Sequence, residues 1–250
     1  MAATLGFDVG GSAIKAAAVD TRTGELRGEP REVPTPKPAT PAAVESALRD
    51  LAALLKQTEG PVGLAFPTVV VAGRARTAAN VDRSWIGVDG AALVTAATGR
   101  PGYFVNDADA AGLAEMRFGA GRNTAGTTLM LTFGTGIGSA LFVDGKLWPN
   151  TELGHMEVKG QEAEAQASAR IRTANHLSWA DWARAVNVVL DAYQRLLWPE
   201  LVIVGGGISE HWSHFGHLLK ADTRIVPAQL RQHAGVVGAA VYAVESERRP

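Results

Sequence analysis

The chain has no cysteine among its 250 residues, which excludes disulfide bonds and metal sites built from thiolates. It has no excess of charge of one sign, because the net charge is −1, and this gives no general reason to expect nucleic acid or an anionic membrane as a partner. It also has no apolar run long enough to cross a bilayer, and residues 1–7 lack the basic and apolar regions of a signal peptide. We therefore expect a cytoplasmic protein without nucleic-acid or membrane partners.

The composition is otherwise typical of a folded globular protein. Hydrophobic residues make up 46% of the sequence and charged residues 20%. A chain of 250 residues is long enough for one or two domains with a substantial core. No low-complexity tail or long linker divides the sequence.

Two glycine-rich turns share a pattern at a fixed distance along the chain. They are Asp8-Val-Gly-Gly-Ser-Ala-Ile-Lys15 and Thr132-Phe-Gly-Thr-Gly-Ile-Gly-Ser139. Asp8 corresponds to Thr132 and, further along, Asp20 corresponds to Asp144, each pair 124 positions apart. Because this distance is almost half of the chain, we interpret the molecule as two related halves.

Each turn is predicted to be the tip of a β-hairpin. Glycine allows a phosphate to approach the backbone closely, and consecutive N–H groups form a site for anions. The alternative is an ordinary hairpin turn that needs positive φ angles, but two such turns in register favour phosphate binding. Two tips facing each other across a cleft would hold one phosphate chain from both sides. In the second half, Asp144-Gly145 is a strong signal for a type I′ hairpin turn.

The order of the predicted elements favours an α/β protein, because strands alternate with helices in both halves. The hairpin that opens each half argues against a purely parallel, doubly wound sheet. Strands are expected at 5–8, 14–19, 31–33, 62–66, 103–105, 127–133, 139–143 and 201–204, and helices at 40–56, 91–98, 108–118, 162–171, 179–197 and 235–246.

Asn106 and Asp107 stand where a predicted buried strand passes into a helix, which is the usual place for ligands in open α/β sheets. An aspartate in this place can simply cap the helix. An amide and a carboxylate together also suit a substrate rich in hydroxyl groups, because the carboxylate accepts a proton while the amide both donates and accepts hydrogen bonds.

Three further segments carry candidate binding residues. Glu152 and His155, in Glu152-Leu-Gly-His155, form a weak zinc pattern because no further ligands follow at metal spacing, but they suit the hydroxyl groups of a sugar. Glu164 is either a sugar ligand or a first-turn acid favoured by the helix dipole. The turn Gly205-Gly206-Gly207 serves either helix packing or contact with a nucleotide.

Taken together, these motifs resemble the ROK family of sugar kinases and repressors, and the resemblance covers essentially the whole chain in order. It implies an actin-like ATPase (ribonuclease H-like) fold, with two similar α/β halves around a cleft. The implied division is a domain of residues 1–106 with the first phosphate motif and a domain of residues 107–250 with the second phosphate motif and the sugar-binding residues. The sequence departs from many family members because Val158-Lys-Gly-Gln-Glu-Ala163 stands where those members carry zinc-binding cysteines, so no zinc site is expected.

Within the family, the cysteine-free pattern resembles the polyphosphate glucokinases. The resemblance implies transfer of a terminal phosphoryl group from inorganic polyphosphate, with ATP as a further donor, to the 6-hydroxyl of glucose. It implies Asp107 as the general base. The implied glucose ligands are Asn106, Asp107, Glu152, His155 and Glu164. Asp8 would orient Mg²⁺ through water. The implied donor-binding residues are Asp8, Gly10, Gly11, Ser12, Lys15, Thr132, Gly134, Thr135, Gly136, Gly205, Gly206 and Gly207.

Some alternatives stay open at this point. Lys15 either neutralises phosphate charge or points away from the tip along its strand. A strictly ATP-dependent glucokinase would share the same motifs, and so in part would a non-catalytic sugar-binding protein or a polyphosphate-hydrolysing protein. Arg74, Arg76 and Arg83 are candidates for a basic groove that polyphosphate would need. The resemblance also leads us to expect a homodimer.

Overall fold

The computed structural model describes residues 3–55, 58–79 and 81–248. They form two compact units, which we call unit 1 (residues 3–114 and 233–248) and unit 2 (residues 115–232). Each unit is built around one mixed five-stranded sheet. Among the residues so described, no helix is both long and apolar enough to span a membrane.

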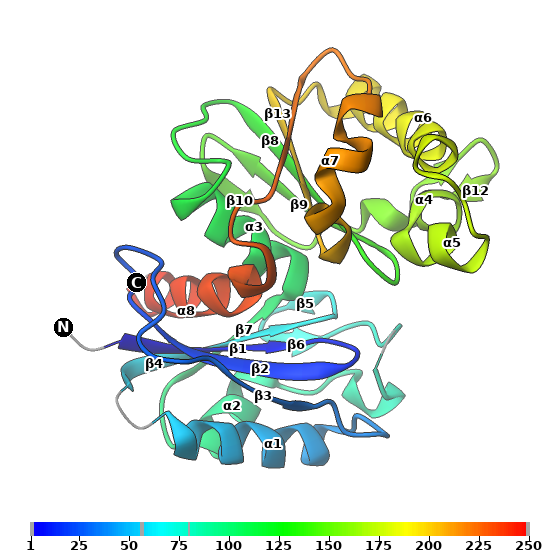
Figure 1. Ribbon diagram of the computed structural model, residues 1–250. Coiled ribbons are helices and arrows are strands. Elements are labelled where there is room, and N and C mark those ends of the chain that lie inside the picture. Colours follow the sequence, from blue (N-terminus) through cyan, green and yellow to red (C-terminus); the bar gives the residue numbers. More distant parts are fainter. Residues whose placement is uncertain (1–2, 56–57, 80, 249–250) are drawn as a thin grey trace. The chain divides into compact units, whose positions relative to one another are not determined.

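The sheet of unit 1 has the strand order β3-β2-β1-β4-β7 (Figure 1). Strand β1 pairs antiparallel with β2, which confirms the first predicted hairpin, and parallel with β4. Its strands are β1 (Ala3–Val9), β2 (Ala13–Val19), β3 (Arg31–Pro34), β4 (Thr58–Phe66) and β7 (Gly102–Asn106). Short elements between β4 and β7 are β5 (Val70–Val71), β6 (Arg74–Ala75) and the 3₁₀ turn η1 (Arg83–Trp85).

Helices α1 (Pro41–Leu54) and α2 (Gly90–Thr98) cover one face of this sheet (Figure 1). Helix α1 begins where predicted, because the Thr40 side chain accepts a hydrogen bond from the N–H of Ala43 and Pro41 occupies the first turn. Apolar residues of both helices and of the sheet form one buried core, in which Phe66 and Phe104 pack around Trp85. This core fixes the strands whose ends carry the predicted site residues.

The opposite face of the sheet is covered by α8 (Ala234–Glu247). The contact is close because both surfaces are built from small residues. A Cβ atom placed on Gly6 would lie 2.0 Å from the carbonyl oxygen of Val236, and one on Gly63 would lie 1.9 Å from that of Ala239. Gly238 approaches Ala110 of α3 (Asp107–Phe118) in the same way, at 1.7 Å from its carbonyl oxygen. The glycines on this face therefore allow α8 to lie directly on the sheet and on α3.

The sheet of unit 2 repeats the first, with the order β10-β9-β8-β13-β14. Strands β8 and β9 form the second predicted hairpin, while β13 pairs parallel with β8 and β14. The turn at Asp144-Gly145 has φ angles of 48° and 74°, as a type I′ turn requires, and so confirms that prediction. The strands are β8 (Thr127–Phe133), β9 (Ile137–Val143), β10 (Lys146–Trp148), β13 (Leu201–Gly205) and β14 (Arg224–Pro227).

Helix α6 (Trp179–Leu197) packs on this sheet through a buried stripe that includes Trp182, Val186 and Tyr193. Ser178 caps its first turn as predicted, by accepting a hydrogen bond from the N–H of Asp181. The smaller elements of unit 2 are η2 (Leu153–His155), β11 (Glu157–Val158), β12 (Gln161–Glu162), α4 (Ala163–Ala167), α5 (Ala169–Ala174), η3 (Gly207–His211), α7 (Trp212–Phe215), η4 (Gly216–Leu218) and, at the boundary, η5 (Arg231–His233).

Two expectations about the chain's organisation differ from the structure. The single helix expected over 162–171 is wrong, because Ser168 is extended (ψ 157°) and separates α4 from α5. The buried Ser168 side chain then accepts a hydrogen bond from Ile171 N–H and begins α5. The compact units also do not divide at residue 106, since α3 begins in unit 1 and α8 returns to the sheet of unit 1.

Candidate active site

Unit 1 brings together three of the predicted charged residues at one end of its sheet. Asp8 lies directly across from Lys15 in the register of β1 and β2, so both side chains lie on the same face. Burial and, to a smaller extent, the nearby Asp107 carboxyl raise the pKa of Asp8 to about 7, while Lys15 acts in the opposite direction. Lys15 therefore lies close to Asp8, and its role in neutralising phosphate charge stays a prediction.

Asn106 and Asp107 have different local roles. The buried Asn106 side chain caps α3, because its Oδ1 atom accepts hydrogen bonds from the N–H groups of Ala108 (2.9 Å) and Asp109 (3.0 Å). Its Nδ2 atom donates to the carbonyl oxygen of Thr68 at 3.1 Å. Asp107 is not the residue that caps the helix, so the capping interpretation considered for it belongs to its neighbour.

The Asp107 side chain is half-buried at the start of α3. Its Oδ1 atom accepts a hydrogen bond from the N–H of Ala108 at 2.8 Å. Burial raises the pKa of Asp107, and the Ala108 N–H partly offsets this effect. A carboxylate with a raised pKa is a stronger base than an ordinary aspartate, and this is the property that proton abstraction from a hydroxyl group needs.

The first glycine turn is held by hydrogen bonds at its base. The N–H of Gly10 donates to the carbonyl oxygen of Ala13 at 2.9 Å, and the buried Thr35 hydroxyl donates to the carbonyl oxygen of Gly10 at 2.6 Å. Gly11 and Ser12 are exposed beyond this base. A Cβ atom placed on Gly11 would meet nothing within 4 Å, so the backbone at the tip is open to a ligand.

In unit 2 the second glycine turn packs against Glu164. The Oε2 atom of Glu164 accepts a hydrogen bond from the N–H of Ile137 at 3.2 Å. A Cβ atom on Gly136 would lie 2.3 Å from the same oxygen, so glycine is needed at this position for the carboxylate to reach the turn. The structure therefore brings one predicted sugar ligand, Glu164, together with one predicted phosphate-binding residue, Gly136.

Glu152 and His155 lie beside this turn, at the start and the end of η2, which is anchored to the sheet and to α6. The buried Ser139 hydroxyl on β9 accepts a hydrogen bond from Leu153 N–H and donates to the carbonyl oxygen of Thr151. The Tyr193 hydroxyl on α6 donates to the carbonyl oxygen of Leu153 at 2.6 Å. These anchors are not evident from the sequence, because their partners are 12 to 40 residues away.

The side chains of Glu152 and His155 themselves are exposed. The His155 Nε2 atom lies 3.9 Å from Glu152 Oε2, and its Nδ1 atom lies 3.5 Å from Glu162 Oε2. Glu162 was not among the predicted site residues. Because both contacts are open to solvent, donors and acceptors for several hydroxyl groups are available in one place.

His155, Glu162 and Glu164 also offer one ligand atom each within 4.8 Å of one another, a set that is chemically able to hold a divalent cation. Carboxylates with one imidazole differ from the cysteine-rich set of the family's zinc site. The absence of stoichiometric zinc stays a prediction, which elemental analysis of purified protein tests directly.

The turn at residues 205–207 lies against the second motif. A Cβ atom on Gly206 would lie 2.5 to 2.9 Å from backbone atoms of Phe133, and the φ angle of Gly206 is +79°. Gly205 pairs with Thr132 in the register of β13 and β8. Close packing therefore explains Gly205 and Gly206. Gly206 and Gly207 are both exposed, and a Cβ atom on Gly207 would meet nothing within 4 Å.

Sequence reasoning missed Arg170, which lies beside the second glycine turn. Its backbone N–H donates to the carbonyl oxygen of Gly134 at 3.0 Å, and its Nε atom donates to that of Thr135, also at 3.0 Å. A cavity of about 420 Å³ opens next to this contact. It is lined by Gly134, Thr135, Ala169, Arg170, Thr173 and Ala174. The break at Ser168, which the sequence pattern does not reveal, places Arg170 here.

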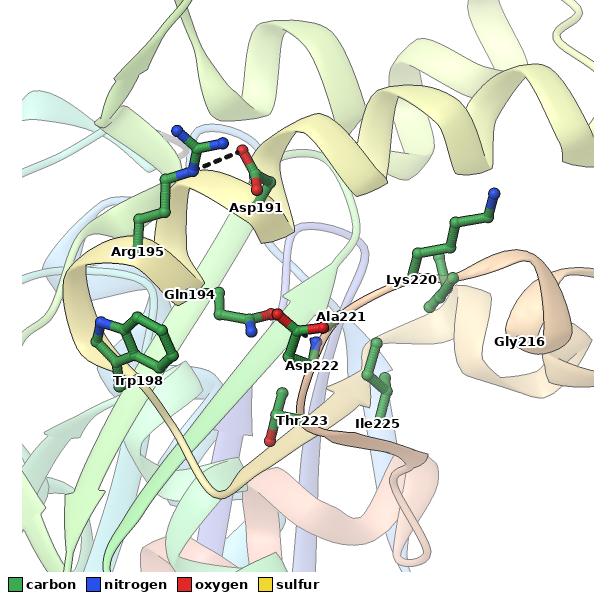
Figure 2. A pocket seen from close by; sticks show the side chains of 11 residues that line it. Asp191, Gln194, Arg195, Trp198, Gly216, Lys220, Ala221, Asp222, Thr223 and Ile225 are labelled. Atoms are coloured by element: carbon green, nitrogen blue, oxygen red, sulfur yellow. Dashed lines mark hydrogen bonds and ion pairs between the residues drawn. The ribbon is translucent and has the colours of Figure 1, made fainter.

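A second cavity, of about 720 Å³, lies in unit 2 at the end of α6 (Figure 2). Its wall carries both signs of charge, since Arg195 pairs with Asp191 at 3.1 Å and Lys220 and Asp222 lie on the following segment. The Gln194 side chain holds that segment by accepting the N–H of Asp222 at 3.0 Å. None of the predicted site residues lines this cavity.

The donor set around Asp8 fits a divalent cation. Magnesium prefers oxygen ligands, and Asp8 offers a carboxylate whose ionised form is disfavoured both by burial and by Asp107. The carboxylate also fills the space beside Gly235, where a Cβ atom would lie 2.3 Å from its Oδ2 atom. A bound cation would offset both unfavourable effects on the charge of Asp8.

Comparisons with known proteins agree with this arrangement. The model of the ROK family matches residues 4–170. The chain is 47% identical to a polyphosphate glucokinase of Mycobacterium tuberculosis over 241 residues, which cover 96% of this chain and 91% of the relative. Its fold matches the crystal structure of an inorganic polyphosphate/ATP-glucomannokinase from an Arthrobacter species with a TM-score of 0.94 and 46% identity, covering 98% of this chain and all of the other. A ROK family glucokinase from Streptomyces griseus, solved in complex with glucose and AMPPNP, matches with a TM-score of 0.82 and 25% identity, covering 97% and 99% of the two chains.

Proposed function

The chain belongs to the ROK family, and on that premise we propose that it is a glucokinase that transfers the terminal phosphoryl group of inorganic polyphosphate to the 6-hydroxyl of glucose. Its fold is the actin-like ATPase fold of the family's sugar kinases. ATP is the second donor, as the name of the Arthrobacter relative indicates for that protein. The products are glucose 6-phosphate and a polyphosphate shortened by one unit, or ADP.

The observation that carries this proposal is that Asn106 and Asp107 have different hydrogen-bonding roles at the start of α3. Asn106 caps α3, so the cap does not depend on the Asp107 carboxylate, which accepts the N–H of Ala108 through Oδ1 and can act on a hydroxyl group. In the proposed reaction, Asp107 accepts the proton of the 6-hydroxyl while that oxygen bonds to the terminal phosphorus and the bond to the leaving phosphate breaks. Because an aspartate is a weak base, the proton moves late, as the hydroxyl oxygen becomes more acidic.

The remaining sugar hydroxyls are held by Asn106, Glu152, His155 and Glu164. Asn106 keeps one N–H of its amide beyond the bond to Thr68, and this N–H can donate to a hydroxyl. Glu152 and His155 are exposed on an anchored turn, so they can bind a sugar with little loss of conformational freedom. Planar carboxylate and imidazole groups recognise the adjacent hydroxyls of a hexose by accepting and donating hydrogen bonds.

The phosphate donor is held by the two glycine turns. On unit 1 the donor-binding residues are Gly10, Gly11, Ser12 and Lys15, and on unit 2 they are Thr132, Gly134, Thr135, Gly136 and Gly207. Asp8 would hold Mg²⁺ through water; when bound, the ion neutralises charge on the phosphates as the group is transferred. Lys15 adds a positive charge on the same face as Asp8.

The decisive experiment measures initial rates of glucose 6-phosphate formation with polyphosphate, ATP and other nucleoside triphosphates as donors. We expect activity with polyphosphate and with ATP, and none in the absence of glucose. Phosphate release without glucose would indicate a polyphosphate-hydrolysing protein instead. Activity with ATP and none with polyphosphate of any length would leave an ATP-dependent glucokinase. We further propose that the protein works in the cytoplasm as a homodimer, and sedimentation analysis tests the oligomeric state.

A further inference from the structure

The cavity beside the second glycine turn has a chemical character that the proposed function does not yet use. Its six lining residues include one cation, Arg170, and neither a carboxylate nor an aromatic ring. The guanidinium group is fixed by the bond from Nε to the carbonyl oxygen of Thr135. Its two terminal nitrogens form no hydrogen bond or ion pair with any other residue that the structure describes. An oriented guanidinium with free terminal nitrogens is well suited to phosphate oxygens.

The size and lining of the cavity favour a chain of phosphates over a nucleoside. The cavity of about 420 Å³ is open to solvent, so an extended chain of phosphates can lie along it without being enclosed. Sites for flat organic rings are mostly lined by large apolar and aromatic side chains. The residues that line this cavity are glycine, alanine, threonine and Arg170, with no large apolar or aromatic side chain to pack against a base.

The two glycine turns carry different charged groups. The first glycine turn has two carboxyl groups at its base, Asp8 and Asp107, which favour a cation and a proton donor. The second turn has Arg170 in contact with its carbonyl groups at Gly134 and Thr135. Arg170 therefore adds a positive charge at the second turn, where the Glu164 carboxylate also lies.

We propose that Arg170, with the cavity next to it, binds the phosphate units of polyphosphate that follow the transferred one, and that it sets the preference for polyphosphate over ATP. This inference rests on the proposed function. It assigns the specificity for long donors to one residue of unit 2. The arginines 74, 76 and 83 of unit 1 are then not required for it, and Arg74 is in fact paired with Asp89.

The test compares Arg170→Gln with wild type and with Arg195→Gln. The control removes the same charge from the same unit at an exposed arginine on α6. We expect Arg170→Gln to raise the KM for long-chain polyphosphate by about tenfold or more, the value of one hydrogen bond to a charged group, and the KM for ATP by less than about threefold. The KM for glucose should stay unchanged. We also expect the KM of wild type to decrease from tripolyphosphate to longer chains, and this decrease to be lost in the variant.

Several outcomes would overturn the inference. A polyphosphate KM of Arg170→Gln within about twofold of wild type would do so. An equal rise of the KM for ATP and for polyphosphate would also do so, because it would mean that Arg170 contacts only the transferred phosphoryl group. An equal effect of Arg195→Gln would indicate diffuse electrostatic attraction instead. Thermal unfolding of each variant shows whether the fold is kept. The variant Arg170→Lys keeps the positive charge and shows whether charge alone is enough for binding. If wild type phosphorylates no glucose, the proposed function fails; direct binding of polyphosphate to wild type and Arg170→Gln then still tests the site.

Discussion

Units 1 and 2 contain the same sheet with different chemistry. Strands β1 and β2 span residues 3–9 and 13–19, and β8 and β9 span 127–133 and 137–143, so the offset of 124 positions holds to the residue. The strand orders β3-β2-β1-β4-β7 and β10-β9-β8-β13-β14 are also equivalent. What differs is the side chain at several equivalent positions. The repeat therefore gives equivalent residues the same place in the two sheets, and the residues that differ between the repeats give each unit its own chemical groups.

The clearest difference lies on the second strand of each hairpin. In unit 1 this strand carries Lys15, which faces Asp8. In unit 2 the equivalent residue is Ser139, a buried hydroxyl that anchors the segment carrying Glu152 and His155. Asp8 itself corresponds to Thr132. The second strand of the hairpin thus carries a charged residue beside Asp8 in unit 1, whereas in unit 2 it anchors the segment with the proposed sugar ligands Glu152 and His155.

The difference between the two units is tested most strongly at Asp107. This residue follows β7 in unit 1, and the equivalent place after β14 in unit 2 has no acidic residue, because Pro227 is followed by Ala228. If Asp107 is the general base, Asp107→Asn should lower kcat by roughly 10²–10⁴-fold. The fold and the glucose affinity should be kept, because Asn106 and not Asp107 caps α3. Steady-state kinetics and thermal unfolding measure both, with the exposed Asp50→Asn as the control. A loss below about tenfold would remove Asp107 from the role of base.

Asp8→Asn should cause the next largest effect, because it removes the carboxylate from the position that is equivalent to the uncharged Thr132 of unit 2. We expect kcat to fall by roughly 10²-fold, as for loss of one electrostatic group of an active site. Without divalent cations, however, the variant should be more stable than wild type at pH 8. The pKa of Asp8 in the folded protein, about 7, exceeds its ordinary value, so the folded state binds more protons and the free energy of unfolding decreases as pH rises towards 7.

The measurement for Asp8 is urea unfolding at pH 4 and pH 8, with and without Mg²⁺. At pH 4 the two proteins should differ little, since a protonated aspartate resembles asparagine. Wild type that is as stable as the variant at pH 8 without cations would show that the charge of Asp8 is not disfavoured in the fold.

The proposed role of unit 2 in glucose binding is tested by the variants Glu152→Gln and His155→Asn. Each should raise the KM for glucose by about tenfold or more, because a hydrogen bond to a charged group contributes roughly 1.5–3 kcal/mol. The donor KM should barely change. The exposed Glu157→Gln on β11 is a matched control. Unfolding of both variants, observed by circular dichroism, would instead assign the pair a structural role.

The smallest effect is expected at the hairpin ends, where Asp20 and Asp144 are equivalent. Asp20 accepts a hydrogen bond from Arg27 at 2.6 Å, and this bond holds the pKa of Asp20 well below its usual range. Its stabilising effect is therefore present at neutral pH and is lost as pH falls below about 4. Asp20→Asn and Arg27→Gln should both lower Tm at pH 7 and converge with wild type at low pH.

Asp144→Asn is the control for this pair. Its carboxylate accepts the N–H of Gly126 at 2.9 Å, and asparagine keeps an oxygen that can accept the same bond. A Tm for Asp20→Asn equal to that of wild type at pH 7 would show that the Asp20–Arg27 pair contributes nothing measurable.

The sequence was sufficient to predict what depends on local pattern. The two hairpins, the type I′ turn at Asp144-Gly145 and the cap of α6 follow from glycine spacing, alternation and capping residues, and all are confirmed. The family assignment also follows from these motifs and is confirmed. The assignments of individual site residues remain predictions, because they depend on a ligand.

What the sequence could not predict depends on contacts distant along the chain. Ser168 ends α4 and begins α5, and the alanine-rich sequence around it gives no signal for this break. The position of Arg170 depends on the break. By the repeat, α8 corresponds to α3 and would be assigned to the second half. It packs on the first sheet instead, because glycines such as Gly6 and Gly63 leave room for its backbone there.

The buried Glu115 has a consequence for how such a protein can be built or rebuilt. Its Oε1 atom accepts the N–H groups of Gln229 and Leu230, and its Oε2 atom accepts that of Ala120. The carboxylate thereby ties the first residues of unit 2 to its last ones. Unit 2 is a single continuous segment inserted into unit 1, and its two ends adjoin. A polypeptide segment whose two ends lie close together can be exchanged between homologous kinases without distorting the rest of the chain. Chimaeras joined at residues 114 and 233 are therefore suitable for transferring donor specificity from one kinase to another.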